Sequence, residues 1–322
     1  MRRRRGRKET AAASSSEERG QSPVSSSAVW NRSLLAVLSA ALVGIILLSI
    51  LYDRGMAVMV DKDEEISTDN SERKTNQVGN HYVVLEVLPH DESAFTQGLT
   101  FFNGNLYEGT GMHGASQLRH VDPQSGNVLS LHQMDPRYFG EGIAHFADAT
   151  GEMQLIQLTW QQKKGFIYRI KDFEVMQEFT YETTTGEGWG ITYDEASREF
   201  VVSDGSSWLV FWDRDTLEEK RRIQVKLRRE QSQEPHVQAI HHVNELEWDN
   251  GTILANLWYQ NVLIRIDPTT GFVQQVYDFS SLYRNRTPKA DCFNGIALTD
   301  TPGELFVTGK WWPHMYRVKL LV

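Results

Sequence analysis

The chain has almost no cysteine and no excess of positive charge, and both absences restrict what it can do. Cys292 is the single cysteine among 322 residues, so the chain contains neither an internal disulfide nor a zinc site built from several thiolates. Lys and Arg number 33 against 42 Asp and Glu, a formal net charge of −9. This acidic balance argues against a nucleic-acid partner, because phosphate contacts need many cationic side chains.

Several common catalytic motifs are also missing. The ten histidines form no HExxH or H-x-H cluster, and no GxSxG elbow, phosphate-binding loop or GxGxxG fingerprint opens a helix. His241 and His242 are adjacent, and neighbours on a strand point to opposite faces, so the two cannot easily bind one ion. Common hydrolase, kinase and dinucleotide-dependent chemistries are therefore unsupported.

The first eighty residues differ in character from the rest. Residues 1–33 carry six positive charges in their first eight positions and then a Ser-rich stretch, which predicts a disordered cytosolic tail. Residues 34–52 include eighteen consecutive uncharged residues, near the roughly 20 that a membrane-spanning helix needs. The sequence therefore predicts a retained signal-anchor helix there, followed over 53–80 by a polar stalk.

The charges around this span predict its orientation. Basic residues precede it and acidic residues follow it, so the positive-inside rule places the N-terminus in the cytosol. We expect a single-pass type II membrane protein of the secretory pathway, in the ER or Golgi, with residues 81–322 in the lumen. Sequons at Asn250 and Asn285 lie on that side and predict a glycoprotein.

Residues 81–322 repeat a three-part unit five times. A short segment recurs every 44 to 55 residues, at Gln97, Glu141, Trp189, Asn244 and Asn294. Each segment is followed by two runs rich in Val, Ile, Tyr and Trp, separated by turn residues. Such spacing is typical of propeller blades. The predicted fold class is all-β, a five-bladed β-propeller preceded by one N-terminal transmembrane helix, with an ordinary β-sandwich as the alternative.

The two ends of the repeat region complement each other. A strand-like run over 81–88 precedes the first repeat, and the last repeat lacks a fourth strand. We expect these ends to complete one blade together, which closes the ring and hides its edges. A weak helical pattern covers 216–229, and an Arg-rich stretch over 226–236 has the character of an insertion.

The repeat also predicts where chemistry is concentrated. Inner strands of a propeller converge on its axis, so residues at their starts and at the ends of the next strands surround one mouth of the central channel. Aromatic, carboxamide and charged residues stand there, which indicates a small-molecule pocket. The predicted mouth is formed by Phe95, Gln97, Phe139, Glu141, Trp160, Trp189, Asn244, Trp258, Asn294 and Lys310.

Nine short segments follow one another in a fixed order along the repeats: FTQGL (95–99), LYEGTG (106–111), FGEG (139–142), LTW (158–160), GWGIT (188–192), NELE (244–247), ANLW (255–258), NGIA (294–297) and VTGKWWPHMY (307–316). Together they closely resemble one known family, the plant-type glutaminyl cyclases or glutaminyl-peptide cyclotransferases. The resemblance covers about residues 82–320 and implies a five-bladed propeller that converts the N-terminal Gln of peptides or proteins to pyroglutamate, releasing ammonia without catalytic zinc.

The resemblance also implies roles for matching residues. It places Glu141, Asn244 and Lys310 at the reaction centre. We expect Glu141 to carry a proton from the attacking amine to the leaving nitrogen, and Lys310 or Asn244 to stabilise the oxyanion. An aromatic enclosure raises the pKa of Glu141 while Lys310 lowers it, so the sequence leaves the net direction open. The substrate is expected to lie among Phe95, Gln97, Phe139, Trp160, Trp189 and Trp258.

Two other functions stay open at this point. One is a membrane-tethered propeller that binds a peptide or glycan without catalysis. The other is a metal-dependent lactonase or hydrolase with one ion held by Glu141, Asn244 and Asn294. If the protein is a cyclase, we expect its catalysis to need no cofactor. A structural cation bound in the propeller channel is compatible with this expectation. The expected partners are peptides or proteins with N-terminal Gln and, through residues 34–52, the membrane; the protein is expected to be a monomer.

Overall fold

The computed structural model of the protein describes residues 81–229 and 236–321. The predicted tail (1–33), anchor helix (34–52) and stalk (53–80) lie outside the described residues. Within the described part, no helix is long and apolar enough to cross a membrane.

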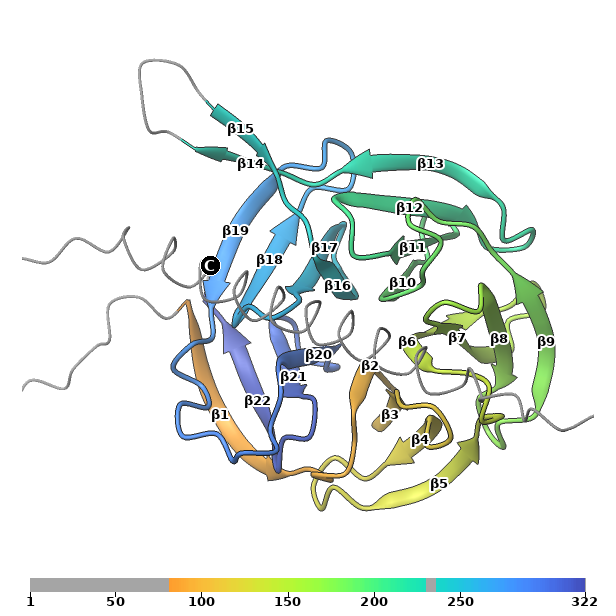
Figure 1. Ribbon diagram of the computed structural model, residues 1–322, viewed down its shortest axis with the longest axis horizontal. Coiled ribbons are helices and arrows are strands. Elements are labelled where there is room, and N and C mark those ends of the chain that lie inside the picture. The colour runs from red at the N-terminus through yellow and green to blue at the C-terminus, as the bar shows by residue number, and fades with distance from the viewer. Residues whose placement is uncertain (1–80, 230–235, 322) are drawn as a thin grey trace, which may run out of the picture. The chain divides into compact units, whose positions relative to one another are not determined.

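Five four-stranded antiparallel sheets surround a common axis (Figure 1), which confirms the predicted five-bladed propeller. Four blades follow the chain from the axis outward, and the fifth combines the first and last described strands. Blade 1 comprises β2 (Thr96–Phe102), β3 (Asn105–Thr110), β4 (Gln117–Val121) and β5 (Val128–Gln133); blade 2 comprises β6 (Gly140–Ala147), β7 (Met153–Thr159), β8 (Lys164–Arg169) and β9 (Val175–Thr180). Blade 3 comprises β10 (Ile191–Asp194), β11 (Glu199–Ser203), β12 (Trp208–Asp213) and β13 (Glu219–Gln224); blade 4 comprises β16 (Val243–Asp249), β17 (Thr252–Leu257), β18 (Val262–Ile266) and β19 (Val273–Asp278); blade 5 comprises β20 (Phe293–Leu298), β21 (Glu304–Gly309), β22 (His314–Leu320) and β1 (Tyr82–Pro89).

The ring closes as the sequence predicts. Strand β1 pairs with β22 in antiparallel register from Tyr82↔Leu320 to Pro89↔His314, and Figure 1 shows the orange β1 beside the blue-violet β22. The inner strands β2, β6, β10, β16 and β20 contact one another in that order and back to β2. Closure joins the first and last described strands, so blade 5 depends on contacts distant in sequence.

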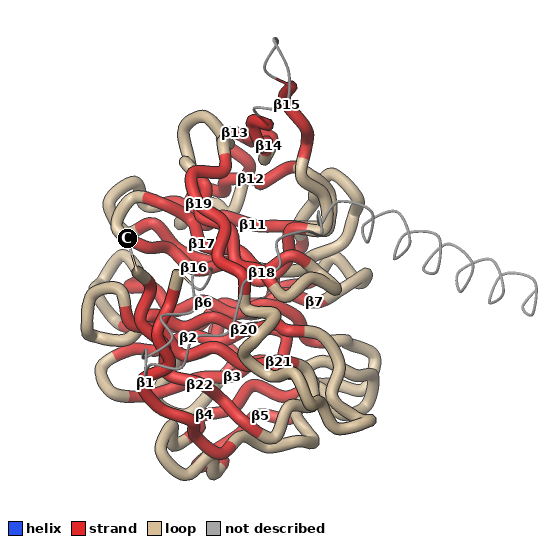
Figure 2. The backbone as a smooth tube through the Cα atoms, turned by 90° about the vertical axis from the view of Figure 1, so that its left-hand side faces the viewer, coloured by secondary structure: helices blue, strands red, loops and turns tan. Residues whose placement is uncertain are grey.

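Apolar side chains fill the space between neighbouring blades. Between blades 2 and 3, for example, Phe146 packs edge-on against Phe200 with ring centroids 4.9 Å apart, and the 1%-exposed Trp212 lies against Tyr181. Inner and middle strands are therefore buried on both faces and rich in β-branched and aromatic residues, whereas outer strands are half exposed. The side view in Figure 2 shows strands as almost the only regular structure.

The weak helical pattern over 216–229 does not correspond to a helix. That segment forms β13 and β14 (Lys226–Arg229), and β14 pairs with β15 (His236–Ala239) in a hairpin outside the blades. The residues of β13, EKRRIQ, have good intrinsic helix propensity, but pairing with β12 overrides it. The Arg221 guanidinium lies 3.4 Å from the Phe211 ring centre and pairs with Glu199, contacts that only the strand provides.

Candidate active site

The recurring position of the repeat lies at one end of the inner strands. Gln97, Glu141, Asn244 and Asn294 are each the second residue of an inner strand, and Trp189 precedes β10 by two residues. Because the next strand of each blade is antiparallel, its final residue returns to the same end. There Trp160, Trp258 and Lys310 directly follow β7, β17 and β21. The structure thus brings all predicted mouth positions to one end of the channel.

Close backbone packing forms the floor of this mouth. A Cβ added to Gly98 would lie 2.8 Å from Gly142 Cα, one added to Gly142 would lie 2.8 Å from Gly190 Cα, and one added to Gly190 would lie 2.8 Å from Glu245 Cα. Real Cβ atoms cannot approach backbone so closely. The glycines that follow Gln97, Glu141 and Trp189 are therefore needed for convergence of the inner strands.

Blade 4 carries a carboxylate where the other blades carry glycine. The Glu245 side chain accepts backbone hydrogen bonds from Leu99 in β2 over 3.2 Å and from Ile296 in β20 over 2.9 Å. It is 1% exposed, and burial together with Glu247 raises its pKa well above the usual value. This side chain ties three inner strands together directly below the mouth.

Glu141 is the buried carboxylate of the site. It is 4% exposed, and its Oε1 accepts a hydrogen bond of 3.0 Å from Nε2 of Gln97. Burial raises the pKa of Glu141 well above the usual range, the Lys310 ammonium opposes that shift, and the Glu187 carboxylate adds to it. The direction left open by the sequence is therefore upward, which favours the protonated form of this carboxyl.

Lys310 places a second charge in the site. It is 4% exposed, and its Nζ lies 4.7 Å from the ring centre of Phe95, a distance suited to a cation–π contact. The next residue, Trp311, has the left-handed φ of 58°, and its amide donates to the Ala94 carbonyl over 2.7 Å. Tyr259 has the same φ of 58° directly after Trp258, so equivalent turns orient both mouth residues.

Partly exposed aromatic rings surround these buried groups. On one side the rings of Trp311, Phe95, Phe139 and Trp160 follow one another with centroids 4.6, 6.0 and 5.7 Å apart. On the other side Trp189 lies 5.4 Å from Trp258, which lies 4.6 Å from Tyr259. The six predicted substrate residues therefore do lie together, five as an aromatic wall and Gln97 on the floor.

Two carboxamide oxygens on the floor accept no hydrogen bond within the described residues. They are Oε1 of Gln97 and Oδ1 of Asn294, both buried. Asn294 donates through Nδ2 to the Thr96 carbonyl over 3.0 Å, which fixes the orientation of its amide. Asn244 is 2% exposed, and its backbone carbonyl accepts a hydrogen bond from the Ser203 hydroxyl over 2.6 Å. Unpaired buried acceptors are costly, so the Gln97 oxygen is suited to an N–H donor on a ligand.

Sequence reasoning missed Glu187. One carboxylate oxygen of this residue, Oε2, accepts hydrogen bonds from both Trp160 Nε1 over 2.8 Å and Trp189 Nε1 over 2.9 Å. Its other oxygen accepts from Gln161 Nε2 over 3.0 Å. Glu187 stands outside the recurring positions, and its role depends on two tryptophans from different blades. The nearby sequence signal is its place two residues before Trp189 in the Gly-rich GEGWG segment.

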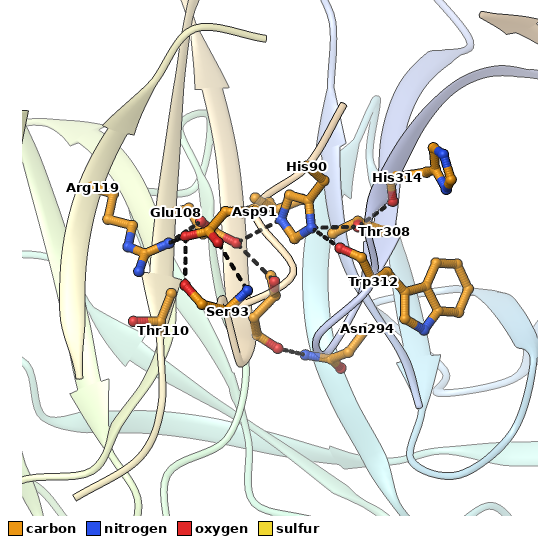
Figure 3. Close-up of polar contacts among 12 residues, drawn as sticks. His90, Asp91, Ser93, Glu108, Thr110, Arg119, Asn294, Thr308, Trp312 and His314 are labelled. Atoms are coloured by element: carbon orange, nitrogen blue, oxygen red, sulfur yellow. Dashed lines mark hydrogen bonds and ion pairs between the residues drawn. The ribbon is translucent and has the colours of Figure 1, made fainter. Parts of the chain in front are cut away.

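A buried ionic cluster joins the two segments that carry Gln97 and Lys310 (Figure 3). His90 lies 3.0 Å through Nε2 from Glu108 Oε1 and 2.7 Å through Nδ1 from the Trp312 carbonyl. Both partners only accept, so both ring nitrogens carry protons. Burial alone would lower the pKa of His90, but the Glu108 charge and these hydrogen bonds raise it. Glu108 also accepts from the Thr96 hydroxyl over 2.7 Å, directly beside Gln97.

The described residues show no metal-binding constellation. No group of three or more His, Cys, Asp or Glu among them has the geometry to hold an ion. His241 and His242 are both exposed. Glu141, one of the three ligands that a metal-dependent hydrolase would need, accepts a hydrogen bond from Gln97 through one of its carboxylate oxygens.

A cavity of about 800 Å³ lies at the opposite end of the channel, where the inner strands end. Its lining includes His145, Glu247 and Asp249. Burial raises the pKa of Glu247 to about 8, and the Leu298 amide donates to this carboxyl over 2.9 Å. None of the predicted site residues lines this cavity, so it is separate from the aromatic mouth.

The fold and the mouth together define a β-propeller with a buried carboxyl and a buried ammonium inside an aromatic wall at one end of its channel. The chain belongs to the glutamine cyclotransferase family, whose model matches residues 57–320. A curated glutaminyl-peptide cyclotransferase from Arabidopsis thaliana is 33% identical over 246 residues, which cover 75% of this chain and 72% of that protein. The crystal structure of a glutaminyl cyclase from Myxococcus xanthus matches with a TM-score of 0.64 and 34% identity, over 75% of this chain and 97% of the other. The predicted family is confirmed.

Proposed function

We propose that the protein is a glutaminyl-peptide cyclotransferase that converts the N-terminal Gln of peptides or proteins to pyroglutamate and releases ammonia. Family membership supports this activity. The observation that carries it in the site is the pairing of buried Glu141 with Gln97 inside the aromatic wall. This arrangement offers a proton-transfer group and an enclosed space of the kind that an intramolecular acyl transfer needs.

The aromatic wall brings the two reacting atoms of the substrate close together. Cyclisation requires the neutral α-amine, whose usual pKa is about 7.7–8.0, to reach the carbonyl carbon of its own side-chain amide. Aromatic surfaces at Trp160, Trp189 and Trp258 fold the extended glutamine side chain so that nitrogen and carbon approach attack distance. The unpaired Oε1 of Gln97 accepts one N–H of the amine and holds the nitrogen beside Glu141.

Glu141 then transfers the proton. The α-amine forms a bond to the amide carbon, and the carboxylate of Glu141 takes a proton from the attacking nitrogen. The tetrahedral centre collapses, the C–N bond to the side-chain nitrogen breaks, and Glu141 returns the proton so that ammonia leaves. The raised pKa makes the carboxylate of Glu141 a stronger base than an exposed carboxylate, so it takes up the proton of the attacking amine more readily.

Negative charge develops on the carbonyl oxygen in this step. Lys310 and the side-chain amide of Asn244 are the two donors at the mouth with the right chemistry, and both are buried. A buried donor aimed at such an oxygen is worth about 2.7–4 kcal/mol in mutational studies. The two roles are separable by experiment, as argued in the Discussion.

No step of this mechanism uses a metal, and zinc independence is part of the proposal. The stated steps need only the carboxyl, carboxamide and ammonium groups of the mouth. A structural cation in the channel stays a prediction. Elemental analysis of the purified protein tests it, and EDTA tests whether turnover needs the ion.

The membrane topology stays a proposal based on sequence. The span over 34–52 and the charges around it support a type II orientation with a lumenal propeller in the ER or Golgi. The sequons at Asn250 and Asn285 are exposed, as glycosylation requires. Protease protection of sealed microsomes and a mobility shift with a glycosidase test both points, and sedimentation in detergent tests the expected monomer.

Ammonia release and the matching mass loss of a Gln-initiated peptide test the activity directly. Full-length protein in detergent should turn the peptide over in the presence of EDTA, and an otherwise identical Ala-initiated peptide should stay unchanged. A folded protein that binds the peptide without releasing ammonia would instead support the alternative, a propeller that binds peptides without catalysis.

A further inference from the structure

The aromatic wall is completed by a carboxylate between Trp160 and Trp189. Trp160 follows β7 of blade 2, and Trp189 precedes β10 of blade 3. Their indole N–H groups converge on a single oxygen of Glu187. This oxygen links blades 2 and 3 at the mouth. Between Trp160 and Trp189 the wall is therefore connected by hydrogen bonds to Glu187.

These hydrogen bonds determine how the two indoles are oriented. An indole N–H has only one direction in which it can donate, so a fixed acceptor restricts the rotation of each ring. The acceptor is itself fixed, because Gln161 donates to the other carboxylate oxygen and the backbone amide of Glu187 donates to the Thr185 hydroxyl over 3.2 Å. Bonds to an ionised acceptor are stronger than bonds to a neutral one.

Glu187 also contributes charge to the reaction centre. Besides burial, the charged groups that act on Glu141 are Lys310, which lowers its pKa, and Glu187, which raises it. Tyr181 lies near both carboxylates, but its hydroxyl donates to the Thr159 carbonyl. On the neighbouring surface Lys163 pairs with the exposed Glu182 over 2.6 Å, so that lysine has a carboxylate partner other than Glu187.

We propose that Glu187 is a positioning residue for the cyclisation: its carboxylate holds Trp160 and Trp189 in the substrate wall, and its charge favours the protonated form of Glu141. The inference rests on the proposed cyclase function. It assigns a role to a residue that stands outside the recurring positions and does not touch the reacting atoms.

Two substitutions separate the two parts of this role. Glu187→Gln keeps the shape and one acceptor oxygen but removes the charge, and Glu187→Ala removes the acceptor as well. Glu182→Gln is the matched control, since it removes a negative charge from the adjacent exposed segment without touching an indole. Each variant is assayed as full-length protein for KM, kcat and the pH dependence of kcat/KM, with circular dichroism and thermal unfolding as checks of the fold.

The expected results differ between variants. Glu187→Ala should raise KM about tenfold, the order expected for losing charge-assisted hydrogen bonds. For Glu187→Gln, the ratio of kcat/KM to that of the unsubstituted protein should rise as pH falls, because the Glu141 carboxylate then persists to lower pH. Ionisation of the free substrate amine is common to both proteins and cancels in the ratio. Glu182→Gln should leave both quantities unchanged.

Several outcomes would overturn the proposal. A pH-independent ratio for Glu187→Gln, together with an unchanged KM for a folded Glu187→Ala, would remove both parts of the role. If Glu187→Ala fails to fold, the pH ratio of Glu187→Gln decides alone. Absence of turnover by the unsubstituted protein would overturn the proposed function and this inference together, whereas normal turnover with unaffected variants would overturn this inference only.

Discussion

Gln97 donates from its side-chain nitrogen to Glu141 Oε1 over 3.0 Å, and these two buried side chains come from different blades. Gln97 belongs to β2 of blade 1 and Glu141 to β6 of blade 2. The hydrogen-bonded pair therefore exists only when the blades are packed in register. The amide oxygen of Gln97 has no partner among the described residues. The pair therefore presents the Glu141 carboxyl group and a free hydrogen-bond acceptor side by side.

Replacing Glu141, the proposed proton carrier, should strongly reduce turnover without unfolding the protein. Glu141→Gln keeps an oxygen that can accept from Gln97, so the pair and the fold should persist. Loss of a positioned acid–base group lowers rates by about 10²–10⁴-fold, and kcat should fall by that order. Ammonia release measures the rate, and thermal unfolding provides the control. Turnover near that of the unsubstituted protein would show that another group carries the proton.

The glycines below the mouth should tolerate no side chain. In Gly142→Ala the new Cβ would lie 2.6 Å from the Trp189 carbonyl oxygen and 2.8 Å from Gly190 Cα. Both are backbone atoms that cannot rotate away, so we expect a loss of about 3 kcal/mol or more in the free energy of unfolding. Urea denaturation measures it.

Gly151→Asn is the control for that substitution. Gly151 has a φ of +86° and meets nothing within 4 Å of an added Cβ, and Asn tolerates left-handed backbone. We expect a change below about 1 kcal/mol. Equal losses at both positions would contradict the packing argument.

The buried His90–Glu108 pair should make stability depend on pH in a defined direction. His90→Gln leaves Glu108 without its closest cation and should cost about 3 kcal/mol near pH 6. Because the folded pKa of His90 is raised, its contribution is complete below the unfolded value of about 6.5 and is lost as pH rises through the folded value. The stability difference between the two proteins should therefore shrink on the alkaline side.

Urea denaturation at several pH values measures this difference. The exposed His241→Gln substitution should change stability little at any of them and serves as the control. A difference that grows with rising pH would show that His90 is neutral in the folded protein, contrary to the two acceptors that face its ring nitrogens.

The elements of this structure differ in how well the sequence alone predicts them. The blade count and the inner-strand positions of Glu141 and Asn244 are predictable because each blade repeats the same local pattern. The polar segment of β13 is not, since an exposed outer strand has little apolar alternation and its pairing is non-local. Glu187 is not predictable for a related reason. Its proposed positioning role depends on hydrogen bonds from two tryptophans that come together only in the folded ring.

The two candidate oxyanion donors can be separated by charge. Both Lys310→Met and Asn244→Ala should lower kcat if each donor contributes, by about 10²–10³-fold for the principal one. They differ in their effect on Glu141. The Lys310 ammonium lowers the pKa of that carboxyl, so its removal should raise the pKa, and the ratio of kcat/KM to that of the unsubstituted protein should fall as pH falls. Asn244→Ala removes no charge, so its ratio should stay flat with pH.

The size of the loss and the shape of the pH profile together assign the roles. A large loss with a flat ratio for Asn244→Ala, beside a small, acid-sensitive loss for Lys310→Met, would make Asn244 the oxyanion donor and Lys310 an electrostatic partner of Glu141. A large loss in Lys310→Met that persists at alkaline pH would assign the oxyanion to Lys310 instead, because the Glu141 carboxylate is then populated in both proteins. A flat ratio for Lys310→Met would contradict the coupling between Lys310 and Glu141 on which both assignments depend.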